Sequence, residues 1–281
     1  PNGAWLAYVV AAENSNDQVH VYNVAKKSDT TVTSDRYDSY SPTWSPDGRF
    51  VYFLSDRNFE SLVSSPWGAR QPEPFFDRTT EIFELSLRKK QASAFQSTDE
   101  LEDDKPKPGD KVKPDAKPKP DDTAAVSIDL DGIAARITRV PVSAGNYTSL
   151  SATGEHLYFV SRSTSKKRTQ TLRAIKCEPD AESATVVSDI ESYRVSGDLK
   201  KILVHKDDDL HVFAASGSSP KSLSKSRVSL SGWRMSVDPT LEWRQMFVDA
   251  WRMERDYFYD PNLHGVDWNE VLARHLPLVD R

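Results

Sequence analysis

A two-strand phrase that recurs along the chain limits its possible folds more than any other feature. The phrase is clearest in residues 41–57, which read SPTWSPDGRFVYFLSDR. Pro46 fixes one backbone angle of a turn corner, and Gly48 supplies the freedom in φ that closing the hairpin requires. The Phe, Val and Tyr residues that follow suit a pleated, half-buried surface. The phrase therefore predicts a β-hairpin with a largely apolar second strand.

A second copy of this phrase lies about a hundred residues further along. Residues 149–162 read SLSATGEHLYFVSR, in which Leu150 takes the place of Trp44 and Gly154 takes the place of Gly48. The two second strands then align through their Tyr-Phe pairs. We therefore expect the same hairpin to be built twice.

A worn third copy spans residues 193–205 and keeps Ser196 with the glycine after it, followed by an apolar strand. Units of about 40–50 residues with three or four short strands are typical of a β-propeller. A β-sandwich would contain similar strands, but it does not predict the recurrence of one phrase. At about 45 residues per blade, residues 1–237 without the charged insertion at 97–123 predict four to five blades of a partial, mainly β propeller.

Several segments outside the three hairpins also have strand-like patterns. They are residues 4–10, 18–24, 30–33, 80–87, 92–95, 126–142, 169–176, 184–187 and 210–215. Between 57 and 80, closely spaced prolines in 66–74 predict an irregular loop, because proline cannot donate to a strand ladder.

Residues 97–123 differ in composition from everything around them. They hold nine acidic residues, six lysines and five prolines, and very few apolar side chains. Such a segment cannot bury enough surface to offset the entropy of ordering its backbone, so we expect a disordered insertion between sheet units. A charged tail that binds a partner is the alternative.

The pattern changes to a helical period at residue 238. Residues 238–281 contain no serine and no lysine, and apolar residues recur with a period of 3.6. Asp238 suits an N-cap and the proline after it suits the first turn, which predicts a helix to about residue 259. Asp267 begins a capping-box pattern for a second helix. We therefore expect residues 238–281 to begin a helical domain.

Glu254 is the one carboxylate expected on the apolar face of the first helix. A carboxylate in apolar surroundings with a raised pKa would be a candidate for nearby chemistry. The alternative is a structural role in which Glu254 pairs with His264, His275 or an arginine. We favour the structural role.

Familiar catalytic patterns are missing from the sequence. There is no G-x-S-x-G, GxxxxGK[ST], GxGxxG or HExxH motif. Residues 205–211 (HKDDDLH) offer two histidines and three aspartates that could hold a metal. The same residues also read as an ordinary polar hairpin, which we favour. No metal ligand, cofactor site or catalytic residue is therefore assigned.

The charge and the cysteine content limit which partners and which cellular compartment we expect. The net charge of −5 argues against broad binding of nucleic acid or anionic lipid. No apolar run reaches the roughly 20 residues that span a bilayer, and the N-terminus does not resemble a signal peptide. Cys177 is the single cysteine, so there is no intramolecular disulfide, and we expect a cytoplasmic protein. A periplasmic location is the alternative if a signal peptide precedes residue 1, since the chain reads as part of a longer protein.

The C-terminal segment contains Glu242-Trp243, residues 250–261 (AWRMERDYFYDP) and residues 264–268 (HGVDW). These residues resemble the start of the helical domain of tricorn proteases and their bacterial homologues. The phrase at 41–57 is similar to the blade hairpin of TolB-like and tricorn-type propellers. The order of the parts also fits that family: the blades come first, then the charged insertion, then residues 126–133 and 140–150, and finally the helices.

The resemblance implies a part of a serine peptidase that degrades short peptides. In that family a seven-bladed propeller forms a channel to or from the active site, and the enzyme assembles as a hexamer. The catalytic histidine lies later in the helical domain, and the nucleophilic serine lies beyond a PDZ domain. His264 and His275 do not match the catalytic position, so this segment should itself be inactive.

Two other classes remain open. One is a TolB-like propeller that binds proteins and has no enzymatic parent, although it would not require the tryptophan-rich helices. The other is the propeller that gates a prolyl-oligopeptidase-like enzyme, which would continue into a hydrolase domain with a G-x-S-x-G motif.

Overall fold

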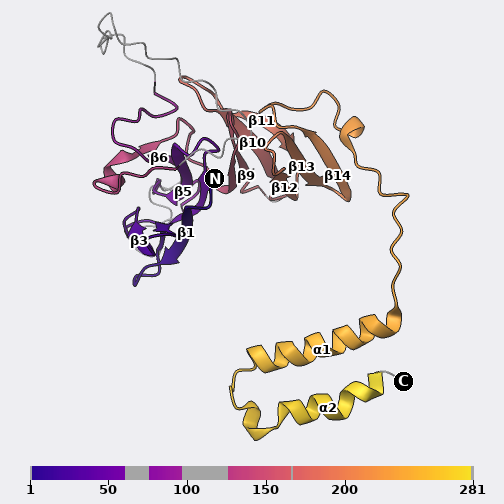
Figure 1. The fold of residues 1–281 in the computed structure, drawn as a ribbon. Coiled ribbons are helices and arrows are strands. Elements are labelled where there is room, and N and C mark those ends of the chain that lie inside the picture. Colours follow the sequence, from indigo (N-terminus) through magenta and orange to yellow (C-terminus); the bar gives the residue numbers. More distant parts are fainter. Residues whose placement is uncertain (1, 61–75, 97–125, 166, 280–281) are drawn as a thin grey trace, which may run out of the picture. The chain divides into compact units, whose positions relative to one another are not determined.

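The computed structural model describes residues 2–60, 76–96, 126–165 and 167–279. These residues form four antiparallel sheets followed by two helices (Figure 1). The expected fold, a mainly β partial propeller followed by helices, is confirmed. The insertion predicted at 97–123 and the irregular loop predicted at 66–74 lie outside the described residues.

Each sheet is built from strands that follow one another in the sequence. The first sheet contains β1 (Trp5–Ala11), β2 (Asp17–Asn23) and β3 (Ser28–Thr31). The second contains β4 (Ser39–Trp44), β5 (Phe50–Asp56), β6 (Thr80–Ser86) and β7 (Ile137–Arg139). The third contains β8 (Tyr147–Ala152), β9 (His156–Arg162), β10 (Gln170–Lys176) and β11 (Ala184–Ser188), and the fourth contains β12 (Ser192–Val195), β13 (Lys201–Lys206) and β14 (Asp209–Ala214).

One backbone hydrogen bond recurs in all four sheets and sets their correspondence. In each sheet, two strands that are consecutive in the sequence form a hairpin. The residue that follows the later strand donates its N–H to the carbonyl of the residue that precedes the earlier strand. The four bonds run from Val24 to Ala4, from Leu87 to Arg49, from Cys177 to Glu155 and from Ala215 to Lys200. Strands β1, β5, β9 and β13 are therefore equivalent, as are β2, β6, β10 and β14. The repeat inferred from the hairpin phrases is confirmed and extends to the first sheet.

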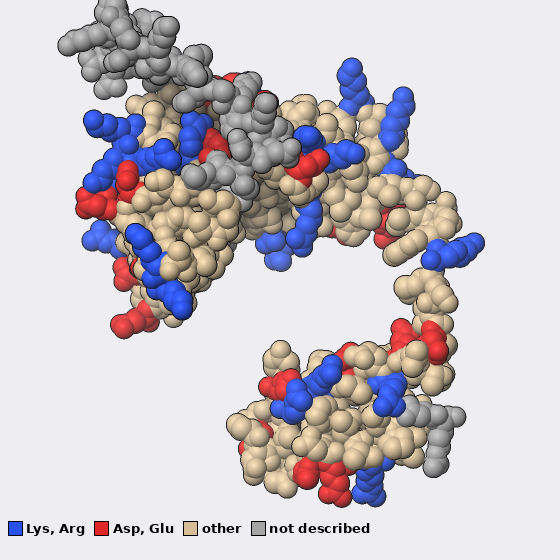
Figure 2. All heavy atoms as spheres, in the orientation of Figure 1, with Lys and Arg blue, Asp and Glu red and all other residues tan. Residues whose placement is uncertain are grey.

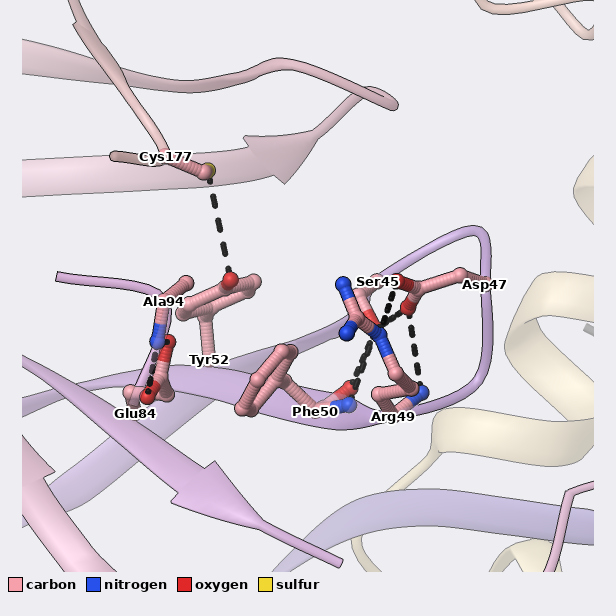
Figure 3. Close-up of polar contacts among 8 residues, drawn as sticks. All are labelled: Ser45, Asp47, Arg49, Phe50, Tyr52, Glu84, Ala94 and Cys177. Carbon is pink, nitrogen blue, oxygen red and sulfur yellow. Dashed lines mark hydrogen bonds and ion pairs between the residues drawn. The ribbon is translucent and has the colours of Figure 1, made fainter. Parts of the chain in front are cut away.

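The turn of the first hairpin is held by side chains as well as by its glycine (Figure 3). The Ser45 hydroxyl donates to Asp47 Oδ1 over 2.6 Å and accepts the Phe50 N–H over 2.9 Å. Asp47 also accepts the backbone N–H of Arg49. Gly48 has a φ of 68°, and a Cβ there would lie 2.9 Å from the side chain of Val126.

The turn of the third copy, between β12 and β13, repeats these three hydrogen bonds. Ser196 donates to Asp198 over 2.5 Å and accepts the Lys201 N–H over 2.9 Å. Leu199 stands where the first turn has Gly48, with a φ of 59°. The third copy is confirmed, and its left-handed residue is a leucine that the Ser-x-Asp bonds hold in place.

The alignment of Leu150 with Trp44 is wrong. Trp44 pairs with Val51, and the residue in the equivalent position of the third sheet is Ala152, which pairs with Leu157. The error arises because the second turn is two residues shorter than the first. Both first strands also contain a bulge, in which Ser41 and Ser149 have left-handed φ angles of 52° and 56°.

Two strand predictions differ from the structure. Residues 92–95, predicted to be strand-like, are irregular with a turn at 94–95, and β7 is the last strand of the second sheet. Most of 126–142, predicted to be strand-like, is irregular or 3₁₀-helical, with β7 as its one described strand. A buried carboxylate, described below, holds the backbone of the turn at Ala94 and so competes with strand pairing.

Hydrophobic cores fill the spaces between successive sheets, and β5 contributes to two of them. Its residues Phe50, Tyr52 and Leu54 pack with β9 and β10 of the third sheet. Val51 and Phe53 alternate with them and pack with β2 of the first sheet. Strand β9 divides its side chains in the same way between the second and fourth sheets. This two-sided burial explains why both strands are continuous apolar runs.

The C-terminal residues form two antiparallel helices, α1 (Pro239–Tyr257) and α2 (Trp268–Val279). Asp238 caps α1 by accepting the N–H groups of Thr240 and Leu241, as predicted. The indole N–H of Trp251 donates to the carbonyl of Trp268 over 2.7 Å, and the indole of Trp268 returns the bond over 2.8 Å. These reciprocal bonds join the two helices at one point.

The chain divides into two compact units, Pro1–Val228 and Ser229–Arg281. The predicted domain boundary between 237 and 238 stays a prediction. Neither described helix combines the length and the apolar character needed to cross a lipid bilayer.

Replacement of Ser45 by alanine should destabilise the sheet unit by about 1–3 kcal/mol, because the buried N–H of Phe50 loses its side-chain acceptor. The matched change Ser196→Ala should cost less, since its turn is solvent-exposed. Urea unfolding of both variants measures the two costs. Equal costs would contradict the importance of burial.

Replacement of Trp251 or Trp268 by phenylalanine should each destabilise the helical pair by about 1 kcal/mol through loss of one hydrogen bond. Trp243→Phe is the matched control on α1, because its side chain is 57% exposed. Thermal unfolding followed by circular dichroism provides the measurement. A loss of stability in the control as large as in the other two variants would show that the reciprocal bonds are not responsible.

Candidate functional site

A pocket of about 510 Å³ lies at the end of the second sheet where β5 and β7 finish and β6 begins. Its charged and polar lining includes Glu60, Asp77, Arg78, Glu81, Arg139 and Ser143. These residues come from three separate parts of the sequence, which the sheet brings together. Volumes of roughly 300–1,000 Å³ are usual for small-molecule sites.

A polar network fixes the strand ends beside the pocket. Asp56 accepts hydrogen bonds from the hydroxyls of Tyr40, over 3.1 Å, and Thr80, over 2.7 Å. It therefore ties together the ends of β4, β5 and β6. Burial raises the pKa of Tyr40 to about 12, so this hydroxyl remains a donor at neutral pH.

Two buried carboxylates form the inner part of the lining. The side chain of Asp77 is only 5% exposed and accepts the Asn146 amide over 2.6 Å. Glu81 is 12% exposed and pairs with Arg139 over 2.9 Å. Asn146 also accepts the backbone N–H of Arg78 over 3.0 Å, so it links the second sheet to the start of the third.

Two arginines form the outer part of the lining. The guanidinium of Arg78 lies 3.7 Å from Asp77. The side chain of Arg78 is 68% exposed, and that of Arg139 is 52% exposed. Beyond these contacts and a 3.4 Å bond from Arg139 to the Val142 carbonyl, no described residue accepts a hydrogen bond from either guanidinium. The pocket therefore presents guanidinium N–H donors, and the buried carboxylates of Asp77 and Glu81 lie next to these arginines.

Aromatic residues surround a third arginine at the same end of the sheet. The guanidinium of Arg57 lies 4.1 Å from the ring centroid of Phe83 and 5.5 Å from that of Tyr37. Tyr37 stacks on the exposed ring of Phe59, which in turn meets Phe76 edge to face. Burial lowers the pKa of Arg57, and the cation–π contacts offset part of that burial cost.

Glu84 is a further buried carboxylate, and it is not among the residues that line the pocket. Figure 3 shows it beside Ala94. It is fully buried on β6 and accepts the backbone N–H of Ala94 over 3.2 and 3.3 Å through its two oxygens. No described lysine or arginine forms an ion pair with it. Burial raises the pKa of Glu84, although hydrogen bonds from Ser93 and Ala94 lower it in part.

Cys177 lies close to the same cluster. Tyr52, which pairs with Glu84 across β5 and β6, donates its hydroxyl to Cys177 Sγ over 3.9 Å (Figure 3). Burial raises the pKa of the Cys177 thiol to about 11, so a reactive thiolate is disfavoured at neutral pH. The cluster is therefore part of the core between the second and third sheets.

The polar hairpin expected at 205–211 is confirmed as the turn between β13 and β14. Its ionisable side chains go to different partners. His205 pairs with Glu191 over 2.8 Å, while His211 bonds to the Leu223 carbonyl over 2.9 Å. Within the described residues, no three His, Cys, Asp or Glu side chains come together as a metal site requires.

Glu254 is exposed on α1, and no described residue forms a hydrogen bond or ion pair with its side chain. The predicted pairing with a histidine or arginine is therefore not observed. His264 instead contacts Asp260, over 3.2 Å, and the hydroxyl of Tyr259, and His275 is exposed on α2. In Figure 2, basic and acidic side chains lie beside one another along both helices, with uncharged surface between them.

Sequence reasoning missed the charged pocket. One signal was available, because Glu81 and Glu84 interrupt an otherwise apolar strand. Buried carboxylates in such a strand need partners, and these could have been sought. Nothing in the sequence pattern indicates that Asp77 and Arg139 would meet.

Comparison with known families gives two adjacent matches. Residues 1–216 match the tricorn protease second beta propeller domain, and residues 239–281 match the tricorn protease C1 domain.

Several known proteins are similar to the chain over its whole length. Two tricorn protease homologues of Streptomyces coelicolor are each 28% identical to it, with 100% of this chain and 24% and 27% of the relatives covered. A crystal structure of the tricorn protease has a TM-score of 0.69 at 19% identity, covering 99% of this chain and 26% of that chain. The chain thus spans about a quarter of the length of the relatives it matches.

Replacement of Glu84 by glutamine should raise stability at neutral pH and flatten its dependence on pH. Because folding raises the pKa of Glu84, its proton favours the folded state below the ordinary pKa, and this contribution is lost as the pH rises through the raised value. The advantage of the variant should therefore grow from pH 4.5 towards pH 8. Urea unfolding across this range, with the exposed Glu182→Gln as control, measures it. A constant difference at all pH values would contradict this account.

Proposed function

Because the chain belongs to the tricorn protease family, we propose that it is a non-catalytic part of a serine peptidase that degrades short peptides. Its propeller blades would form part of a channel through which peptides reach or leave the active site. The catalytic histidine would lie further along the helical domain of the same polypeptide, and the nucleophilic serine would lie beyond a PDZ domain.

The observation that carries this proposal is the order of the two family matches. A propeller domain at 1–216 is followed by the C1 domain at 239–281, in one chain. An isolated binding propeller does not require the second match, and neither does the propeller of a prolyl-oligopeptidase-like enzyme. Neither alternative has an observation of its own that favours it.

The arrangement of strands supports a channel. Strands β4 and β8 open their sheets and pack beside each other, and β1 of the first sheet also packs against β4. Because β1 corresponds to β5, the contact between first strands is the one between β4 and β8. First strands that pack beside each other in neighbouring blades are what a central passage in a propeller requires. The charged pocket lies at the end of the second sheet where β6 begins.

We propose no catalytic residue in this chain. His264 contacts Asp260 and the hydroxyl of Tyr259, where a catalytic triad requires a serine or cysteine nucleophile. No described serine or cysteine forms a hydrogen bond with His264 or with His275. The full-length protein would be the peptidase, and this chain alone would be inactive.

Cleavage of chromogenic short peptides tests the proposal directly. The full-length protein should hydrolyse them and should be labelled by a serine-directed fluorophosphonate, whereas the 281-residue chain should do neither. If the channel controls access, the full-length protein should also cleave short peptides much faster than an unfolded protein substrate. Hydrolysis by the isolated chain would overturn the assignment, and so would an inactive full-length protein.

Location, assembly and domain division belong to the same proposal. We place the protein in the cytoplasm, with a periplasmic location as the alternative, and expect a homo-hexamer. The blades would end at residue 237 and the helical domain would begin at 238. Cell fractionation, light scattering of the full-length protein and limited proteolysis near residues 229–238 address these points in turn.

A further inference from the structure

We propose that the charged pocket at the end of the second sheet binds the carboxylate group of a short peptide. The carboxylate follows from the chemistry of the pocket itself. The peptide as its carrier rests on the proposed function, and the experiment below separates the two.

Hydrogen bonds and an ion pair fix the positions of the two buried carboxylates that line the pocket. Asp77 and Glu81 are buried, and burial of a charge is costly unless it is paired. Asn146 and Thr164 bond to Asp77 over 2.6 and 3.4 Å, while Arg139 pairs with Glu81 over 2.9 Å. These contacts hold both carboxylates behind the arginines.

The groups left for a ligand are therefore the guanidinium N–H donors. Those of Arg78 are the most available, since its nearest described carboxylate oxygen lies 3.7 Å away, beyond ordinary hydrogen-bond length. Arg139 has further N–H donors beyond those that bond to Glu81 and Val142. A guanidinium group matches a carboxylate in geometry and can bind it through two parallel hydrogen bonds.

The charge balance favours a zwitterionic ligand with no net charge over a strongly anionic one. Glu60, Asp77 and Glu81 face two arginines in the lining, so the pocket has no excess of positive charge. Glu60 is exposed at the edge, where it would repel a phosphate or a polyanion but would suit the ammonium group of a peptide. A short peptide with both termini free offers a carboxylate to the arginines and an ammonium group to Glu60.

Titration of the ¹⁵N-labelled 281-residue chain with trialanine, followed by NMR, tests the proposal. Trialanine should bind with a Kd on the order of 1 mM, and its C-terminal amide should bind at least tenfold more weakly. An acetylated and amidated Ala-Asp-Ala distinguishes a side-chain carboxylate from a terminal one. Binding of either carboxylate over the amide supports the proposal, whereas equal binding of the amide, or no binding of any of them, overturns it.

Variants then place the site. Arg78→Gln should weaken trialanine binding at least fivefold, and so should the charge-neutral pair Arg139→Gln with Glu81→Gln. Arg194→Gln, which removes an exposed arginine on β12, is the matched control and should bind as the unchanged chain does. Unfolding curves confirm that each variant is folded. Unchanged affinity in the pocket variants would overturn the proposal.

Two further arms separate the possible failures. Inorganic phosphate that competes as well as trialanine would show a general anion site and overturn the choice of ligand. Acetate that binds at Arg78 while no peptide does would retain the carboxylate chemistry and reject the peptide. Neither result depends on peptidase activity, so the proposed function is judged separately by cleavage in the full-length protein.

Discussion

Burial of the second strand on both of its faces is the constraint on which the rest of this sheet unit depends. In β5 and β9, successive side chains enter two different cores, one shared with the sheet before and one with the sheet after. Each sheet is therefore stabilised by its neighbours and cannot complete its core alone. At roughly 25 cal/mol per Å² of apolar surface removed from water, burial in these interfaces stabilises the folded sheets.

The same constraint confines polar chemistry to the ends of the strands. The residues of β5 are buried along almost its whole length. The charged side chains of the pocket therefore come from strand ends and from the connections between strands. Glu84 is the exception, and it is held within a buried strand only because the turn at Ala94 folds over it. Loops on a rigid scaffold are where binding groups usually lie.

How much of this could be predicted depends on how local the determining contacts are. The hairpins, the capped helix at Asp238 and the change of fold near residue 238 follow from short-range patterns, and they were predicted. Leu150 was aligned with Trp44 because the two sequences were matched at Gly48 and Gly154. That match does not reveal that the second turn is shorter than the first. The pocket was missed because Asp77 and Arg139 are brought together only when β7 pairs with β6. Glu254 was expected to pair with a histidine or an arginine, but its side chain lies exposed on α1 and no described residue pairs with it.

The two turns that share one hydrogen-bond network differ in their left-handed residue, Gly48 in one and Leu199 in the other. The Ser-x-Asp pair, present in both, supplies the bonds that close the loop. Glycine can thus be lost as sequences drift while the serine and aspartate keep the geometry. A blade too divergent to be recognised by its glycine should then be detectable by a serine two residues before an aspartate, at the point where an apolar strand is about to begin.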